Sequence, residues 1–229
     1  MFPKSLLTAG AVLAAAAAIA AVPGPRQDEA ASRASLRLDP VILSAAEQAE
    51  VSRGKIVLRA VASPGLKGKA FEAVGTLPGT LDEVLAVVLD YRHYDAFMPR
   101  IDRTVVTDET PLVALVELHL KLPLGMSRRY RLRYSACVGS DGFRVDWVKV
   151  PWPEVPPSQT VVDTSGHWQV GRTADGELLG LYHVYSDPGR VPLGMKGLAA
   201  SLSKHDLPKV IEAVRSRLRP PAGPGRYKD

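Results

Sequence analysis

The stretch VALVELHLKLPLGMSRRYRLRYSA, residues 113–136, decides the fold class. In its first half, Leu118 and Leu120 alternate with Glu117 and His119. Its second half alternates in the same way, with tyrosine or leucine at every second position and arginine between them. A period of two is typical of a strand with one face covered and the other in water. The stretch therefore predicts two neighbouring antiparallel strands.

The same alternation extends on both sides of this stretch, from residue 103 to residue 186. A proline-rich loop at residues 151–157 interrupts it, and Asp175-Gly176 suits the positive backbone angles of a tight hairpin turn. Two further strands are expected upstream. The full set of expected strands is 56–62, 70–75, 103–107, 113–122, 128–136, 143–148, 160–172 and 177–186.

Short helices are predicted before the long run of strands. The first covers residues 43–51, where Ser44 is the expected cap. A glutamate three residues later gives the spacing of a capping box. A second helix is expected to start at Leu81, and a third to cover residues 91–98.

The last segment, residues 191–218, predicts by far the longest helix. Its apolar side chains recur at spacings of three and four, which is typical of an amphipathic helix that covers a sheet. Pro208 is expected to bend it. Strands and helices thus occur in separate runs, and the sequence predicts an α+β domain. The apolar positions of this helix are Leu198, Leu202, Leu207, Val210, Ile211, Val214 and Leu218.

The N-terminus is typical of an exported precursor. Lys4 is followed by an uncharged, alanine-rich run at residues 5–22. Small residues in it and Pro23 beyond it predict cleavage after Ala20 or Ala21. We expect an exported protein, periplasmic or secreted; the alternative is an uncleaved segment that tethers the domain to a membrane. The expected organisation is a signal peptide at 1–21, a flexible spacer at 22–42, one domain at 43–219 and a disordered tail at 220–229.

Composition excludes several classes of protein. The net charge is +5 with a pI near 9.4, but the basic residues are dispersed among acids, so we expect no nucleic-acid partner. A transient contact with an anionic membrane surface is the alternative use of this charge, beside ordinary solubility. Cys137 is the single cysteine, so the fold rests on burial without an internal disulfide. We also expect a monomer.

Three segments resemble the START-like superfamily, also called SRPBCC or Bet v 1-like. They are DYRHYDAFMPRI at residues 90–101, DPGRVP at residues 187–192, and the amphipathic helix that follows. The resemblance covers about residue 51 to about residue 218. It implies a helix-grip fold, which is a curved antiparallel β-sheet wrapped around a long C-terminal α-helix, with two short helices after the first strand. The family includes carriers of lipids, sterols and quinones, and polyketide aromatases and cyclases.

The residues themselves favour an apolar pocket. A curved sheet closed by a helix with covering side chains as short as those of Leu198, Ala199 and Leu202 leaves an apolar space. Together with this space, the resemblance implies a lipid, sterol, quinone or similar apolar molecule as the ligand. His183 and His205 are candidates for polar contacts with it, although the alternation leaves open which face of the last two strands lines the pocket. The sheet residues expected to line it are Leu118, Leu120, Tyr130, Leu132, Tyr134, Phe143, Trp147 and Trp168.

The sequence contains no Gly-x-Ser-x-Gly elbow, phosphate loop or His-Glu-x-x-His motif, and its five histidines are not at metal-ligand spacing. We therefore expect no catalytic residue, metal site or cofactor, and a binding or carrier protein rather than an enzyme. The alternative is a polyketide cyclase-like or aromatase-like enzyme that uses the same pocket. The arginines at 129, 131 and 133 are expected on a solvated outer face; the alternative is that they bind phosphate headgroups. Trp152 is expected to be exposed in a loop at the pocket mouth.

Overall fold

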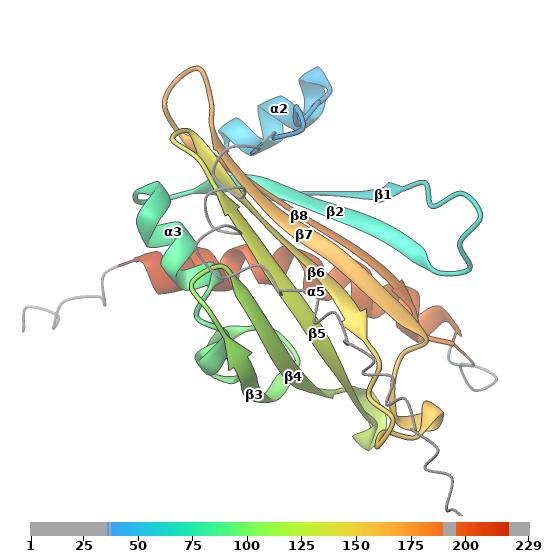
Figure 1. Ribbon diagram of the computed structural model, residues 1–229. Helices are drawn as coiled ribbons and strands as arrows, with labels where there is room; N and C mark the ends of the chain where they lie inside the picture. Colours follow the sequence, from blue (N-terminus) through green and yellow to red (C-terminus); the bar gives the residue numbers. More distant parts are fainter. Residues whose placement is uncertain (1–35, 37, 190–195, 220–229) are drawn as a thin grey trace, which may run out of the picture.

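One eight-stranded antiparallel sheet forms the centre of the molecule, in the order β1-β2-β8-β7-β6-β5-β4-β3 (Figure 1). The computed structural model describes residues 36, 38–189 and 196–219, except for the side chains of residues 124 and 196–204. The eight strands of this sheet confirm the expected strands, within a few residues at their ends. Their bounds are β1 Val57–Val61, β2 Lys69–Leu77, β3 Ile101–Glu109, β4 Val113–Lys121, β5 Ser127–Val138, β6 Gly142–Val150, β7 Asp163–Arg172 and β8 Leu178–Asp187.

The alternating stretch becomes strands β4 and β5, which pair with Leu118 opposite Tyr130. Leu118 and Leu132 are buried on the inner, concave face of the sheet, whereas Glu117 and Arg131 point to the outer face and pair there. Because side chains alternate between the two faces, the two-residue period separates a dry face from a wetter one.

The capping box predicted at the start of the first helix is also confirmed. Ser44 and Glu47 form a capping box at the start of α2, and Thr80 and Glu83 form another at the start of α3. Each box satisfies backbone N–H groups that have no partner inside the helix. The short helices α3 and α4 follow β2, the second strand along the chain. The helices are α2 Ala45–Ser52, α3 Leu81–Val88, η1 Tyr91–His93, α4 Tyr94–Phe97, η2 Pro123–Gly125, η3 Pro157–Gln159 and α5 Lys196–Leu218.

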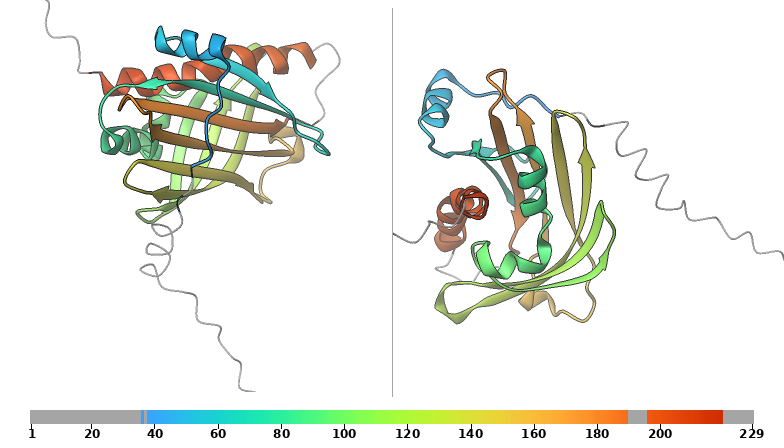
Figure 2. Two further views of the ribbon diagram at one scale, coloured as in Figure 1. Left: turned by 90° about the horizontal axis from the view of Figure 1, so that it is seen from above. Right: turned by 90° about the vertical axis from the view of Figure 1, so that its left-hand side faces the viewer.

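Helix α5 lies on the concave face of the sheet, and α3 and α4 lie beside it (Figure 2). Helix α5 contacts β1, β2, β8, α3 and α4. Ile211 and Val214 are fully buried in this layer, as the apolar spacing of the helix predicts. Arg215 fixes the C-terminal end of the helix, because its guanidinium donates to the carbonyl oxygens of Thr76 at 2.8 Å and Gly54 at 3.0 Å. The sheet thus curves around one long helix.

A short segment before α2, residues 38–44, crosses the outer face of the sheet; we call it the strap. The strap is held at Asp39, whose backbone N–H and C=O both bond to the buried Gln169 side chain, at 3.1 and 2.6 Å. Arg59 donates to the carbonyl of Ile42 at 2.7 Å. Leu38 lies against Gly142 and Gly171, where a Cβ atom would collide with its side chain. Residues 38–42 of the expected spacer are therefore bonded to the sheet.

The expected signal peptide and the expected tail lie outside the described residues. No helix in the described ranges has both the length and the apolar character needed to cross a membrane.

Candidate functional site

A cavity of about 140 Å³ lies between the inner face of the sheet and the helices. Seven of the residues expected to line a pocket do line it: Leu118, Leu120, Tyr130, Leu132, Tyr134, Trp147 and Trp168. The other described lining residues are Tyr94, Met98, Pro99, Ile101, Thr164, Tyr182, Val184 and Val210. The lining is mainly apolar and aromatic, which is usual for a small-molecule site. The volume is close to that which holds one benzene-sized group.

Aromatic rings form the sheet side of the cavity. The Trp147 ring stacks on the Tyr182 ring with their centroids 5.1 Å apart, and Trp168 meets the same tyrosine edge-on at 5.0 Å. Tyr134 lies 6.0 Å from Trp147. Each ring is therefore held by its neighbours, and the wall is preformed.

The segment at residues 90–101, one of the three that carry the family resemblance, forms the opposite wall. Tyr91 packs on Tyr134 with the ring centroids 4.4 Å apart. The Tyr94 hydroxyl donates to the carbonyl of Val88 at 2.5 Å, which ties α4 back to α3. Met98 then begins the turn that lines the cavity. The aromatic residues of this motif thus place α4 over the sheet.

One ion pair joins this wall to the closing helix. Arg100 lies between Pro99 and Ile101, both of which line the cavity, and has a positive φ of 66°. A residue other than glycine in this conformation is under backbone strain. The Arg100 Nε atom lies 2.9 Å from the Asp206 carboxylate on α5, and this contact holds the strained turn against the helix. The cavity wall and α5 are therefore coupled.

Three tyrosine hydroxyls supply the polar character of the cavity. Within the described part of the chain, the hydroxyls of Tyr130, Tyr134 and Tyr182 have no hydrogen-bond partner. Burial raises the pKa of Tyr130 to about 12, and burial also raises the pKa values of Tyr134 and Tyr182. These hydroxyls stay protonated at physiological pH, so each can donate one hydrogen bond and accept others.

The structure places three of the expected site residues outside the cavity lining. Phe143 is buried in the core near α3 and does not line the cavity. His205 is exposed on α5, beside the Asp206 that binds Arg100. His183 points to the outer face of the sheet. The side chains of Leu198 and Leu202 lie outside the described residues.

The position of His183 follows from the pairing of the last two strands. Trp168 lies directly opposite Tyr182, and His167 lies opposite His183. Opposed residues share a face, so a chain that turns Trp168 inward must turn His183 outward. The same register brings Tyr182 and Val184 to the cavity, two lining residues that the sequence reasoning missed. The hairpin turn at Asp175-Gly176 was the signal that could have found them, because it fixes this register.

On the outer face, His183 belongs to a polar row across four strands. Its Nδ1 atom lies 3.1 Å from Glu72, which also pairs with Arg59 at 2.7 Å. Burial acts to raise the pKa of the Glu72 carboxyl, but the contacts with His183 and Arg59 outweigh it and the pKa is lowered. The His167 ring stacks on that of His183 at 5.0 Å, and burial and the nearby Arg144 charge lower its pKa to about 4. His167 is therefore neutral at physiological pH.

The loop after β6 differs from the sequence expectation. Trp152 was expected to be exposed at a mobile pocket mouth, but it is half-buried against the outer face of β5. The guanidinium groups of Arg129 and Arg131 lie over its ring, 5.7 and 4.8 Å from the centroid. Arg129 also donates to Gln159 at 3.0 Å, so the loop is fastened at both ends. Cation–π contacts with two arginines are the physical reason that the indole turns inward.

The sequence matches no protein-family model and no curated protein. The structure is similar to fragment 25–204 of a STAR-related lipid transfer protein from Xanthomonas axonopodis, with a TM-score of 0.61 and 19% identity over 72% of this chain and 94% of that one. It is also similar to human STARD10, with a TM-score of 0.60 and 15% identity over 86% and 80% of the two chains. For human StAR-related lipid transfer protein 5 the TM-score is 0.56, with 11% identity over 72% and 82%. At these identities the comparisons establish the fold.

Proposed function

Because the chain has the helix-grip fold of the START-like superfamily, we propose that it is an exported carrier or binding protein for an apolar small molecule. The observation that carries the proposal is the aromatic cavity between the sheet and α5, with seven of its lining residues foreseen from the sequence. Binding would be a partition of the ligand out of water, worth about 25 cal/mol for each Å² of apolar surface that is buried. The solved structures with this fold include lipid transfer proteins, which supports a lipid-like ligand.

The tyrosine hydroxyls narrow the chemistry of the ligand. Tyr130, Tyr134 and Tyr182 offer hydrogen bonds in a site that is otherwise apolar. An uncharged ligand with one carbonyl or hydroxyl group, such as a sterol or a quinone, satisfies them without bringing a charge into a dry cavity. A fully saturated hydrocarbon would leave these hydroxyls without partners.

A whole sterol or quinone is larger than the cavity. Sites for ligands of that size have volumes of about 300 Å³ or more. The wall must therefore move on binding, and the turn at Arg100 is the described segment best placed to do so. On the α5 side its strained backbone is held by the Arg100–Asp206 ion pair, which is a weak restraint, and on the sheet side by the Lys121 N–H, which donates to the Arg100 carbonyl at 2.9 Å.

A carrier fits the site better than a cyclase or aromatase. A cyclase would need a group that gives or takes a proton near physiological pH. The polar side chains that line the described cavity are the tyrosines, whose raised pKa values keep them protonated, and Thr164, whose hydroxyl donates to the carbonyl of Tyr185 at 2.8 Å. These groups can orient a ligand.

Mass spectrometry of lipids extracted from the purified protein tests the proposal. We expect one class of apolar molecule to be recovered repeatedly, and to be lost in Val184→Phe, which fills the cavity. Val148→Phe is the matched control, because it makes the same change on the outer face, where Val148 is 50% exposed. Protein that is repeatedly empty and does not take up fluorescent sterols or fatty acids would contradict the proposal.

A second variant tests the polar contacts. Tyr182→Phe removes one hydroxyl and keeps the ring that stacks on Trp147. We expect about a three- to tenfold loss of affinity for a ligand with a carbonyl or hydroxyl group, and no change for a ligand that lacks it. Equal losses for both ligands would indicate that the hydroxyl only supports the wall.

The export part of the proposal rests on the N-terminal sequence. Sequencing the mature N-terminus of the protein from cell fractions tests it. A start at Ala21 or Val22 in a soluble fraction outside the cytoplasm is the expected result. An intact Met1 in the membrane fraction would support a tethered pocket, and an intact Met1 in the cytoplasm would contradict export.

A further inference from the structure

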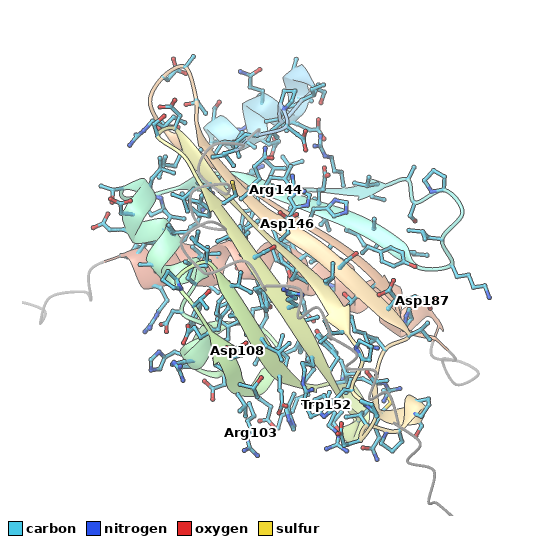
Figure 3. The ribbon with its side chains drawn as sticks, in the orientation of Figure 1. Arg103, Asp108, Arg144, Asp146, Trp152 and Asp187 are labelled. Atoms are coloured by element: carbon cyan, nitrogen blue, oxygen red, sulfur yellow. The ribbon has the colours of Figure 1, made fainter. Side chains whose placement is uncertain are left out.

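A cluster of arginines covers the outer face of strands β3 to β5, on the side of the sheet away from the cavity. We call Arg103, Arg129, Arg131 and Arg133 the basic face. Their positions follow from the register, in which His119 of β4 lies between Arg103 of β3 and Arg129 of β5. Figure 3 shows Arg103 at the rim of this region and Trp152 near it. Four positive charges therefore lie on neighbouring positions of one surface.

Most of this charge is not neutralised within the described part of the chain. Glu117 pairs with Arg131 at 2.7 Å. Arg129 bonds to the neutral Gln159. Arg103 and Arg133 are exposed and have no ion-pair partner among the described residues. Arg129 and Arg131 stabilise the loop at Trp152, but like charges on one face of a sheet repel one another, and the charges of Arg103 and Arg133 are not compensated among the described residues. An anionic partner would neutralise them.

The apolar residues beside the arginines indicate what kind of anion fits. Val148 is 50% exposed and lies directly opposite Arg133, and Val113 is 36% exposed on the next strand. Trp152 is half-buried under the guanidinium groups of Arg129 and Arg131. Arginine with tryptophan and aliphatic side chains is the composition of surfaces that lie at a bilayer interface, where phosphate groups border acyl chains. A nucleic acid would offer phosphates without an apolar layer for the valines.

We propose that the basic face binds the surface of an anionic lipid bilayer. This inference rests on the proposed carrier function, because it gives the protein a place to collect or deliver its ligand. Strand β5 links the two surfaces, since Arg129 and Arg131 point outward from it while Tyr130 and Leu132 line the cavity. The bilayer and the cavity would therefore be separated by the thickness of one sheet.

The experiment measures binding to vesicles of equimolar phosphatidylcholine and phosphatidylglycerol, with pure phosphatidylcholine vesicles for comparison. We expect binding to the anionic vesicles alone, and its loss at high salt. The double variant R103Q/R133Q should bind about thirtyfold more weakly. The matched control K67Q/R172Q also removes two exposed positive charges, from positions away from the basic face, and should bind like the unchanged protein.

Tryptophan fluorescence gives a second readout that net charge alone would not move. Trp147 and Trp168 are 4% and 2% exposed, so Trp152 is the tryptophan that can report a contact at the surface. We expect a blue shift of emission on adding anionic vesicles, and its loss in Trp152→Phe. Equal weakening in both double variants, equal binding to both vesicle types, or tighter binding to a DNA duplex than to vesicles would each overturn the inference.

Failure of the membrane-binding proposal can be distinguished from failure of the proposed carrier function. R103Q/R133Q should keep its extracted ligand, and the cavity-filled Val184→Phe should still bind anionic vesicles. If no ligand is ever recovered but vesicle binding shows the expected pattern, the carrier function fails and the membrane surface stands. If the ligand is recovered and both double variants bind vesicles alike, the carrier function stands and the proposed membrane surface fails.

Discussion

Strands β7 and β8 carry two neighbouring ring pairs with the same spacing and different chemistry. On the inner face Trp168 lies opposite Tyr182, and on the outer face His167 lies opposite His183; in both pairs the ring centroids are 5.0 Å apart. Trp168 is 2% exposed, whereas both histidines are half-buried among charged groups. A shift of one residue along a strand thus separates a dry aromatic wall from a polar row. For these four residues, the face of the sheet decides whether the ring lines the cavity or belongs to the polar row.

The largest difference between the two faces should appear on removing one ring from each. Trp168→Ala should lower the free energy of unfolding by about 3–5 kcal/mol, because it leaves a cavity in the core. His167→Ala removes a half-buried ring beside solvent and should lower it by about 1 kcal/mol. Urea denaturation of the two variants measures both values. Equal losses would contradict the contrast between the faces.

A glycine of β7 tests how tightly the inner face is packed. Gly166 lies opposite Trp147 and Val184, and a Cβ atom added there would collide with the Trp147 ring and the carbonyl oxygen of His183. Gly166→Ala should lower the free energy of unfolding by about 1–3 kcal/mol. Ser165→Ala changes the adjacent residue on the other face and should be near neutral. A neutral Gly166→Ala would show that the aromatic wall can move.

The outer face has its own test at Gln169, which bonds to both backbone groups of Asp39. Gln169→Ala should release the strap and lower the free energy of unfolding by about 1–2 kcal/mol. Amide exchange of residues 38–42 should become faster, while exchange in β4 and β5 stays unchanged. As the control, Asp39→Asn loses only the exposed ion pair with Arg144 and should cost about 0.5 kcal/mol or less. Unchanged exchange in the strap of Gln169→Ala would show that other contacts hold it.

The smallest effect is a pH dependence that only the outer ring pair should show. His167 has a pKa of about 4 in the folded chain and about 6.5 when unfolded. The unfolded state therefore binds the proton first as pH falls, so the contribution of His167 to the free energy of unfolding should decrease between about pH 6.5 and pH 4 and stay constant below that. His167→Gln should remove about 1 kcal/mol of that decrease, allowing for the solvent that reaches the ring. Unfolding curves at several pH values measure this. If His167 does not cause the pH dependence, the unchanged protein and His167→Gln will show parallel profiles of unfolding free energy against pH.

Local signals predicted the elements well. Capping residues such as Ser44 set the starts of helices, and the two-residue period set the strands, because both depend on residues close in the chain. The inner-facing residues of β4 and β5 followed from the same alternation. These are the parts of the fold and the cavity that the sequence predicted.

What the sequence did not predict depends on pairing between distant residues. His183 was a candidate for the pocket beside Trp168, and the alternation left open which face of the last two strands lines it; the register of β7 and β8 puts the two residues on opposite faces. The strap has no periodicity, and its partner Gln169 is 130 residues away. Trp152 turns onto the outer face because two arginines of another strand bind it. Each of these depends on long-range geometry that alternation does not encode.

The sheet order has a consequence for how the chain reaches this structure. Strand β2 pairs with β8, the last strand. The free edge of the β1–β2 hairpin therefore cannot pair until residues 178–187 have been synthesised. The strap likewise cannot bind the sheet before β7, which carries Gln169, has been synthesised. Such contacts of high sequence separation are slow to form, because the intervening chain must first be ordered. During synthesis the N-terminal strands therefore cannot complete their pairing in the sheet until the last strand has been made.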